Sequence, residues 1–421
     1  MDKAHRRPSR WLLPALSLTT LLPSLDTSIA NVALPTLAET WNASFSQVRW
    51  VVLAYLIALT GLILGAGRLG DRVGRRRVLI AGIGLFTGAS LLSGLAPSLP
   101  FLVGSRALQG AGAATMIALS MALAMEAVPA GKVGRALGLI GSMSAVGTTL
   151  GPSLGGVLIA GFGWRAIFLV TVPLGAATLL LVARAIPGDR VEPRGGGSNR
   201  GSAPLLPMLI GDRRLAASLA MSAIVATVMM ATLIVGPFYL SQALGLGAAQ
   251  VGIAMSAGPF AAALAGVPAG RLVDRFGVHR ATWLGLAGMT AGLLALAAVP
   301  QSFGIAGYVG AIAVVTVHYA LFQTANNSNV INNAPSESRG LASGLLSLSR
   351  NLGLIAGASA MGAIFAFASS SSGVAAGMRA TFTVAAFLVL VALALAVLQR
   401  GVRTMLTGRS RSWQSGAAER V

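Results

Sequence analysis

The chain has 421 residues, of which 55% are hydrophobic and only 10% are charged, and it contains no cysteine. Soluble domains carry about a quarter charged residues, so this composition is typical of a polytopic helical membrane protein. It also excludes disulfides and thiolate metal sites. The net charge of +20 would suggest nucleic acid for a soluble chain. Here the basic residues are interpreted as a topology signal, and no nucleic-acid partner is expected.

Apolar segments of about 20 residues recur along the chain with short breaks between them. They predict twelve membrane-spanning helices, at 11–35, 48–69, 77–96, 100–126, 136–160, 164–184, 215–240, 249–271, 280–299, 303–331, 341–367 and 379–399.

The expected fold is an all-α polytopic membrane protein with two pseudo-symmetric bundles of six helices, at 1–184 and 215–400. The segment 185–214 contains "PGDRVEPRGGGSNRGSAP" and is predicted to be a flexible cytoplasmic linker. The basic residues at 401–421 are predicted to form a cytoplasmic tail without regular structure.

Lysine and arginine gather in the N-terminal segment, the linker, the tail and every second loop. The alternate loops hold only Arg49, Arg165 and Arg379. Basic residues accumulate on the cytoplasmic side of membrane proteins, so both termini are expected in the cytoplasm. A signal peptide remains an alternative for the first helix, because a basic segment followed by an apolar run also matches that pattern.

The two halves of the chain share a repeated loop. "GRLGDRVGRRR" at 67–77 is followed 203 residues later by "GRLVDRFGVHR" at 270–280. An internal repeat of this kind is typical of secondary transporters, which bind substrate near the membrane midplane between their halves. Anchoring of the loops at the cytoplasmic surface is the simpler alternative, but it does not account for the repeat.

The first predicted helix contains one charged residue, Asp26, in "LDTSIANVALP". An ionised, unpaired carboxylate in an apolar span costs several kcal/mol, so Asp26 is expected to have a function or a partner. Arg106 lies inside the fourth helix, with Gln109 one turn away, and Arg350 lies inside the eleventh. Extension of Arg106 to the membrane surface is the alternative, and Arg106 and Arg350 are both candidate partners of Asp26.

The fifth predicted helix carries glycines at every fourth position. Gly147, Gly151 and Gly155 share one face, which lets another helix approach closely, and Pro152 can bend the helix. Ordinary helix packing is the alternative interpretation.

Polar and aromatic side chains on several helices are candidates to line a substrate cavity. The tenth helix presents a broad face of this kind, for which hydrogen bonding between helices is an equally acceptable interpretation, and its histidine is more often a core residue than a proton relay. The candidates are Asn31, Gln109, Tyr239, His318, Tyr319, Phe322, Gln323 and Asn326.

Enzyme motifs are missing from the sequence. There is no G-x-x-x-x-G-K-[ST] loop, and "GAGAAT" at 110–115 lies inside an apolar helix with no strand before it. An enzyme is therefore not expected, and neither a cofactor nor a metal is expected.

These motifs resemble the major facilitator superfamily over nearly the whole chain. "GRLGDRVGRRR" is similar to its loop between helices two and three, and "RALQGAGAA" at 106–114 to its helix-four motif. "LDTSIANVALP" and "GWRAIFLVTVPLG" resemble signatures of its drug:proton antiporters, in the branch that usually has fourteen helices. The helix-five pattern matches the antiporter motif, at Gly138, Gly147, Gly151, Pro152, Gly155 and Gly156.

The resemblance implies proton-driven export of amphipathic small molecules by alternating access in a bacterial cytoplasmic (inner) membrane, by a monomer embedded in the lipid bilayer. It implies that Asp26 is the coupling carboxylate and Arg106 its positive neighbour. The repeated loops would supply the cytoplasmic gate, with Gly67, Asp71, Arg72, Gly74, Arg75, Asp274 and Arg275. Two alternatives remain: uptake of a metabolite such as a sugar or peptide, and a membrane sensor on a transporter-like scaffold.

Overall fold

The structure is a computed structural model that describes residues 11–127, 133–186, 213–298, 303–334 and 339–418. Within these residues, twelve helices or helix pairs are long and apolar enough to cross a membrane, as the sequence predicts. The linker prediction for 185–214 falls almost entirely on residues outside the described ranges.

We call α1 to α8 the first half. Its helices are α1 (Leu12–Thr40), α2 (Phe45–Val48), α3 (Trp50–Val73), α4 (Arg75–Gly94), α5 (Leu99–Ala127), α6 (Val133–Phe162), α7 (Ala166–Leu169) and α8 (Thr171–Ala185).

We call α10 to α16 the second half. Its elements are α10 (Arg213–Phe238), the π-helix η2 (Tyr239–Ala243), α11 (Ala248–Phe276), α12 (Val278–Ala298), α13 (Gly304–Asn333), α14 (Arg339–Ala356), the π-helix η4 (Gly357–Met361), α15 (Gly362–Ser372) and α16 (Val374–Ala418).

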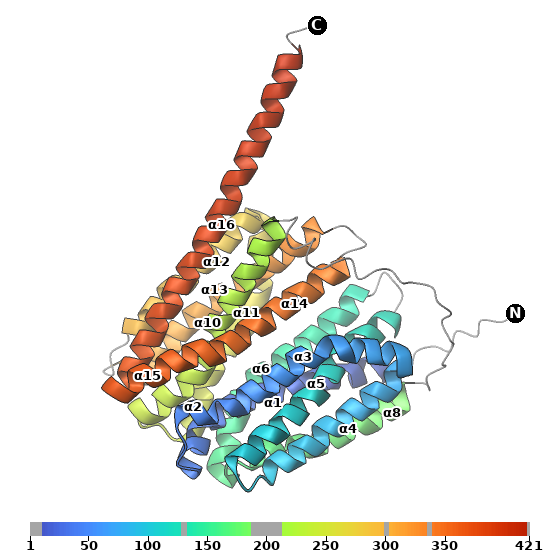
Figure 1. Ribbon diagram of the computed structural model, residues 1–421, viewed down its shortest axis with the longest axis vertical. Helices are drawn as coiled ribbons and strands as arrows, with labels where there is room; N and C mark the ends of the chain where they lie inside the picture. Colours follow the sequence, from blue (N-terminus) through green and yellow to red (C-terminus); the bar gives the residue numbers. More distant parts are fainter. Residues whose placement is uncertain (1–10, 128–132, 187–212, 299–302, 335–338, 419–421) are drawn as a thin grey trace, which may run out of the picture.

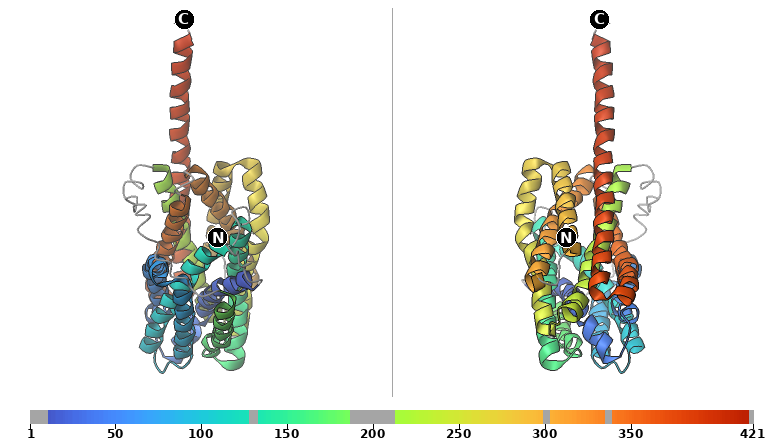
Figure 2. Two further views of the ribbon diagram at one scale, coloured as in Figure 1. Left: turned by 90° about the vertical axis from the view of Figure 1, so that its right-hand side faces the viewer. Right: turned by 90° about the vertical axis from the view of Figure 1, so that its left-hand side faces the viewer.

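The last helix is longer than the sequence predicts. The prediction that 401–421 lacks regular structure is wrong up to Ala418, because α16 continues as one helix to that residue. The chain contains no proline after Pro335, so no residue in this segment blocks a helix as proline would. Figure 2 shows this extension projecting beyond the other helices.

The repeated loop has the same backbone form in both halves. Gly74 separates α3 from α4 with φ 112°, and Gly277 separates α11 from α12 with φ 81°. Positive φ is accessible to glycine at little cost, so the matched glycines make the sharp turn between consecutive helices. We call the end of the molecule at these two turns the basic end, since the arginine-rich loops lie there.

The two halves approach each other most closely away from the basic end. Figure 1 shows them converging near α2 and α15 and diverging towards the two chain termini. The glycine-rich helix α6 of the first half also packs along α11 of the second half. We call the end near α2 and α15 the opposite end.

Candidate functional site

Asp26 is paired with Arg106 in the interior of the first half. Asp26 lies near the middle of α1, and Arg106 lies about two turns into α5. Nη1 of Arg106 donates to Oδ2 of Asp26 at 2.5 Å, and both side chains have 0% of their surface exposed. Arg106 therefore does not extend to a membrane surface, and Arg106 rather than Arg350 is the partner of Asp26.

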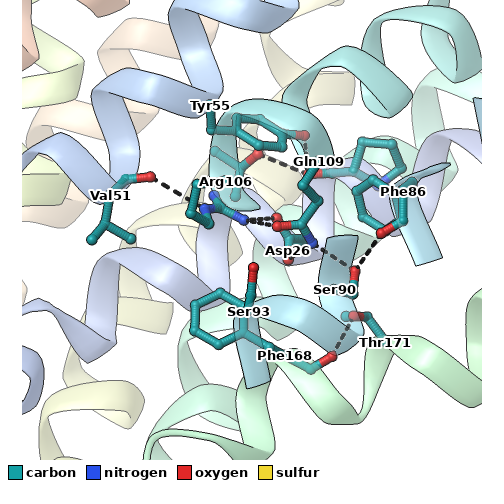
Figure 3. A network of polar contacts seen from close by, with 12 residues as sticks. Asp26, Val51, Tyr55, Phe86, Ser90, Ser93, Arg106, Gln109, Phe168 and Thr171 are labelled. Atoms are coloured by element: carbon teal, nitrogen blue, oxygen red, sulfur yellow. Dashed lines mark hydrogen bonds and ion pairs between the residues drawn. The ribbon is translucent and has the colours of Figure 1, made fainter. Parts of the chain in front are cut away.

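Gln109 completes this arrangement from the next turn of α5. Its Nε2 donates to Oδ1 of Asp26 at 2.8 Å and to the hydroxyl of Ser90 on α4 at 2.7 Å. Its Oε1 accepts from Nη1 of Arg106 at 2.5 Å. Figure 3 shows these side chains pointing toward one another from three helices. Both carboxylate oxygens of Asp26 thus have a donor, which the burial of a charge requires.

Arg106 makes its remaining contacts with α3 and α7. Its Nε donates to the carbonyl oxygen of Val51 at 3.2 Å, and its guanidinium lies 4.4 Å from the ring centre of Tyr55 and 5.7 Å from that of Phe168. Its Nη2 is buried and has no partner within the described structure. Protonation of Asp26 would leave Arg106 without a counter-ion, held by neutral groups alone.

The glycines of α6 face two different helices. A Cβ at Gly147 or Gly151 would meet α1, at the Leu21 carbonyl oxygen (2.6 Å) or the Ser28 side chain (2.5 Å). A Cβ at Gly156 would meet α11, at the carbonyl oxygen of Ala248 (2.5 Å).

Two further residues of the α6 glycine pattern also divide between contacts with α1 and contacts with α11. Gly155 faces α1 like Gly147, while the carbonyl oxygen of Pro152 lies against Gly252 of α11. Gly138 lies in a part of α6 whose side-chain surroundings are outside the described residues. A single helix therefore joins the Asp26-bearing helix to the second half at close range.

Two serine side chains of α1 also face α6. Ser24 hydrogen-bonds Ser144 at 2.6 Å, and Ser28 donates to the carbonyl oxygen of Thr148 at 2.8 Å. These hydroxyls therefore connect α1 to α6.

Most of the polar face of the tenth spanning helix, α13, lines one small pocket of about 90 Å³. Arg350 of α14 and residues of α10 complete its walls. The predicted cavity residues that contribute to it are Tyr319, Phe322, Gln323 and Asn326, and Asn327 and Ile331 of the same helix also line it.

Four of the predicted cavity residues lie elsewhere. His318 packs against Gly288 of α12 and bonds the carbonyl oxygen of Val314 on its own helix. Gln109 belongs to the Asp26 network. Tyr239 is buried and stacks on Tyr308 with ring centres 6.2 Å apart. Asn31 is 1% exposed, and neither polar atom of its side chain has a partner within the described structure.

The residues of the repeated loops lie at the basic end. Arg75 donates to Asp71 in an exposed ion pair of 2.8 Å, and Arg76 donates to the carbonyl oxygens of Ala183 and Ile186 at the end of α8. Arg72 lies in the last turn of α3, and a Cβ at Gly67 would meet nothing within 4 Å.

In the second half, the Arg275 guanidinium lies 5.4 Å from the ring centre of Phe276, and Asp274 precedes it in α11.

Two contacts between the halves were not anticipated from the sequence. Nη1 of Arg49 donates to the carbonyl oxygen of Ser359 in η4 at 2.8 Å. Phe45 lies with its ring centre 4.8 Å from those of both Phe238 and Phe365. The sequence feature that could have indicated the first contact is Arg49 itself, because it is one of the few basic residues in the alternate loops.

The close packing of two glycines, in α14 and η4, against α10 was also not predicted. Cβ atoms at Gly353 and Gly357 would meet backbone oxygens of Ala223 and Thr227 in α10. Their four-residue spacing could have identified them, as it did for the fifth helix. Among the residues that the structure describes, no group of three or more potential metal ligands occurs.

Comparison with known proteins gives a consistent result. The family model described as Major Facilitator Superfamily matches residues 16–358. The chain is 26% identical to the riboflavin transporter RibZ of Clostridioides difficile, over 85% of this chain and 88% of that protein. It is 28% identical to the multidrug efflux pump LfrA of Mycolicibacterium smegmatis, over 90% of this chain and 86% of that protein. The structure is similar to that of a D-xylose-proton symporter, with a TM-score of 0.77 and 17% identity over 92% of this chain and 96% of that one.

Proposed function

The chain belongs to the Major Facilitator Superfamily, and we propose that it exports amphipathic small molecules in exchange for protons by alternating access. It is a multi-pass membrane transporter and not an enzyme. The observation that supports proton coupling best is the fully buried pair of Asp26 and Arg106, held by Gln109.

Asp26 is the proton-binding group in this proposal. A proton on its carboxylate removes the charge that Arg106 neutralises, and breaking a buried pair by removing one partner typically costs about 3–5 kcal/mol. A membrane potential supplies about 2.3 kcal/mol per charge per 100 mV. Because these two energies are of similar size, one proton can bias the equilibrium between two conformations.

The contacts of α6 provide a route from the proton site to the second half. Gly147 and Gly151 bring α6 against α1, which carries Asp26, and Gly156 brings the same helix against α11. A shift of α1 when Arg106 loses its counter-ion therefore displaces α6 and, with it, the interface between the halves.

Orientation follows from charge. We assign the basic end to the cytoplasm, with both termini there, because arginine-rich loops accumulate on that side. The Arg49–Ser359 and Phe45 contacts then close the opposite, outer end, so this conformation faces inward. The bacterial relatives favour the cytoplasmic membrane as its location.

Export is favoured over uptake by the α6 glycines, whose pattern matches the antiporter motif at each of its fixed positions, and by the similarity to LfrA. The similarity to RibZ, a riboflavin transporter, favours the alternative of metabolite uptake, and the experiment distinguishes uptake from export.

The test compares the wild type with Asp26→Asn in an efflux-deficient bacterial host and in proteoliposomes with an imposed pH gradient. The wild type should lower drug susceptibility and move a fluorescent amphipathic dye against its gradient, whereas Asp26→Asn should do neither while remaining folded. Glu39→Gln is the matched control, because it removes a carboxylate from an exposed position on the same helix. Undiminished pH-driven transport by Asp26→Asn would refute the coupling role, and accumulation of dye would indicate uptake.

A further inference from the structure

Arg350 carries a positive charge in the second half that no protein carboxylate neutralises within the described structure. It lies on α14, about three turns from the start of that helix, and its side chain is exposed. The described residues contain no ion pair or hydrogen bond to it, and it lies near enough to the hydroxyl of Tyr319 to interact with it electrostatically. Arg106 in the first half, by contrast, is fully buried and paired.

The acidic residues of the second half are too few to supply a partner in the membrane. Residues 213–400 contain only Asp274 and Glu337. Asp274 lies in the last turn of α11 at the basic end, and Glu337 is outside the described residues, in the segment before α14. Asp26 is already neutralised by Arg106. The intramembrane charge that remains is therefore positive and is located at Arg350, and an arginine at such a position is expected to bind an anion.

Arg350 lines the pocket of about 90 Å³ with polar groups of α13. Nδ2 of Asn326 donates to the backbone oxygen of Ser218 at 3.1 Å, which fixes the orientation of the amide. The Asn326 side chain is only 2% exposed, yet its Oδ1 has no hydrogen-bond partner within the described residues. The pocket thus offers a guanidinium for an anionic group and an unused acceptor for a hydroxyl or N–H group of the same ligand, beside the apolar walls of Phe322 and Leu346.

We propose that this pocket binds the carboxylate of an amphipathic organic acid, so that the transported molecules are acids rather than lipophilic cations. The inference rests on the proposed export function, whose substrate class it names. A water molecule occupies about 30 Å³ of liquid, so 90 Å³ accommodates a carboxylate group but not a whole drug-sized molecule, whose remainder extends outside the pocket. Guanidinium matches a carboxylate with two parallel hydrogen bonds, which lysine cannot reproduce.

The test measures binding of acid and ester pairs that differ in one charge. The full-length protein in nanodiscs is titrated with rhodamine B, fluorescein and naphthoic acid, and with the ethyl ester of each, by fluorescence anisotropy or intrinsic tryptophan quenching. The wild type should bind each acid about tenfold or more tightly than its ester, as expected for a charge-assisted hydrogen bond. Arg350→Gln should reduce the affinity for the acids to that for the esters, and Arg350→Lys should give intermediate values.

Arg184→Gln is the matched control, since it removes an equal charge from an exposed position in the last turn of α8 and should leave the acid preference unchanged. The inference is overturned if the wild type binds acids no better than esters or binds neither. It is also overturned if Arg350→Gln weakens the binding of acids and esters equally. Asp26-dependent export of the esters alone would retain the proposed function and overturn this inference. Arg350-dependent acid binding without proton-driven export would do the reverse.

Discussion

Arg49 and Ser359 lie 310 residues apart in the sequence, and a hydrogen bond of 2.8 Å joins them across the two halves. The acceptor is a backbone carbonyl in η4, where the π-helical turn changes the i→i+4 pattern of α14 and α15. Nε of the same arginine is buried and has no partner within the described residues. The contact therefore adds one charged hydrogen bond to the Phe45 ring contacts that join the halves at the opposite end.

Replacing Arg49 should open that end. We expect Arg49→Gln to shift the population toward the outward-open state, because the carbonyl of Ser359 loses its charged donor. The chain has no cysteine, so one cysteine introduced at Gly362, which is buried against Phe45 and Arg49 at this contact, reports accessibility to an impermeant maleimide. Labelling should accelerate by about 5- to 30-fold, corresponding to about 1–2 kcal/mol. In the control Arg165→Gln, whose arginine bonds within the first half, the rate should not change; equal rates in all three proteins would contradict the prediction.

Gly156 should not tolerate a methyl group. The Cβ of Gly156→Ala would lie 2.5 Å from the carbonyl oxygen of Ala248 and 2.9 Å from Cα of Gly252. Both are backbone atoms that cannot rotate away, so α6 and α11 must separate, at a cost of about 1–3 kcal/mol. We expect a lower Tm and slower transport. Gly161→Ala on the same helix meets nothing within 4 Å and should behave as the wild type; similar losses in the two variants would mean that the close approach is not responsible.

The energetic coupling of Asp26 and Arg106 can be measured with a double-mutant cycle. Arg106→Gln leaves a buried carboxylate with Gln109 alone, and Asp26→Asn leaves a buried guanidinium, so each should destabilise the protein by about 3–5 kcal/mol. The double variant should lose less than the sum by about 0.5–3 kcal/mol, measured by unfolding in detergent. Asp26→Asn combined with Arg165→Gln should be additive. Additivity in both pairs would show that the ion pair contributes no net coupling.

The two turn glycines should be sensitive to alanine, and the other repeated glycines should not. At φ 112° and 81°, Gly74 and Gly277 adopt conformations that cost an alanine about 1–3 kcal/mol. Gly67 and Gly270 occupy matching positions of the same repeat but have open space around a Cβ. We therefore expect Gly74→Ala and Gly277→Ala to lower Tm, while Gly67→Ala and Gly270→Ala leave it unchanged. A uniform response of all four would refute a conformational origin.

The number of spans and the close-packing face of α6 were predictable because both depend on local periodicity. Hydrophobic runs set the helices, and a four-residue spacing places Gly147 and Gly151 on one face. The ends of helices were less predictable: α16 runs on to Ala418 because nothing in the sequence after Leu398 interrupts a helix as proline would.

Contacts between distant residues could not be predicted. Asp26 and Arg106 are 80 residues apart, and a helical periodicity does not say which of two arginines meets a carboxylate. His318 shows the same limit: its position beside Tyr319 placed it on the polar face of α13, but its ring packs against Gly288 of α12. Which side of a helix faces a neighbour depends on tertiary packing, and the sequence gives only the order of side chains around the axis.

The groups around Asp26 all come from α1, α3, α4, α5 and α7, whereas the pocket of Arg350 is built from α10, α13 and α14. Substitutions that reshape the pocket therefore need not touch the ion pair. On the two proposals above, the residues that select the substrate lie in one half and the residues that bind the proton lie in the other, so either set can change without the other. We therefore expect a hybrid of the first half of this chain and the second half of a relative to couple to protons as this chain does and to transport the substrates of the relative.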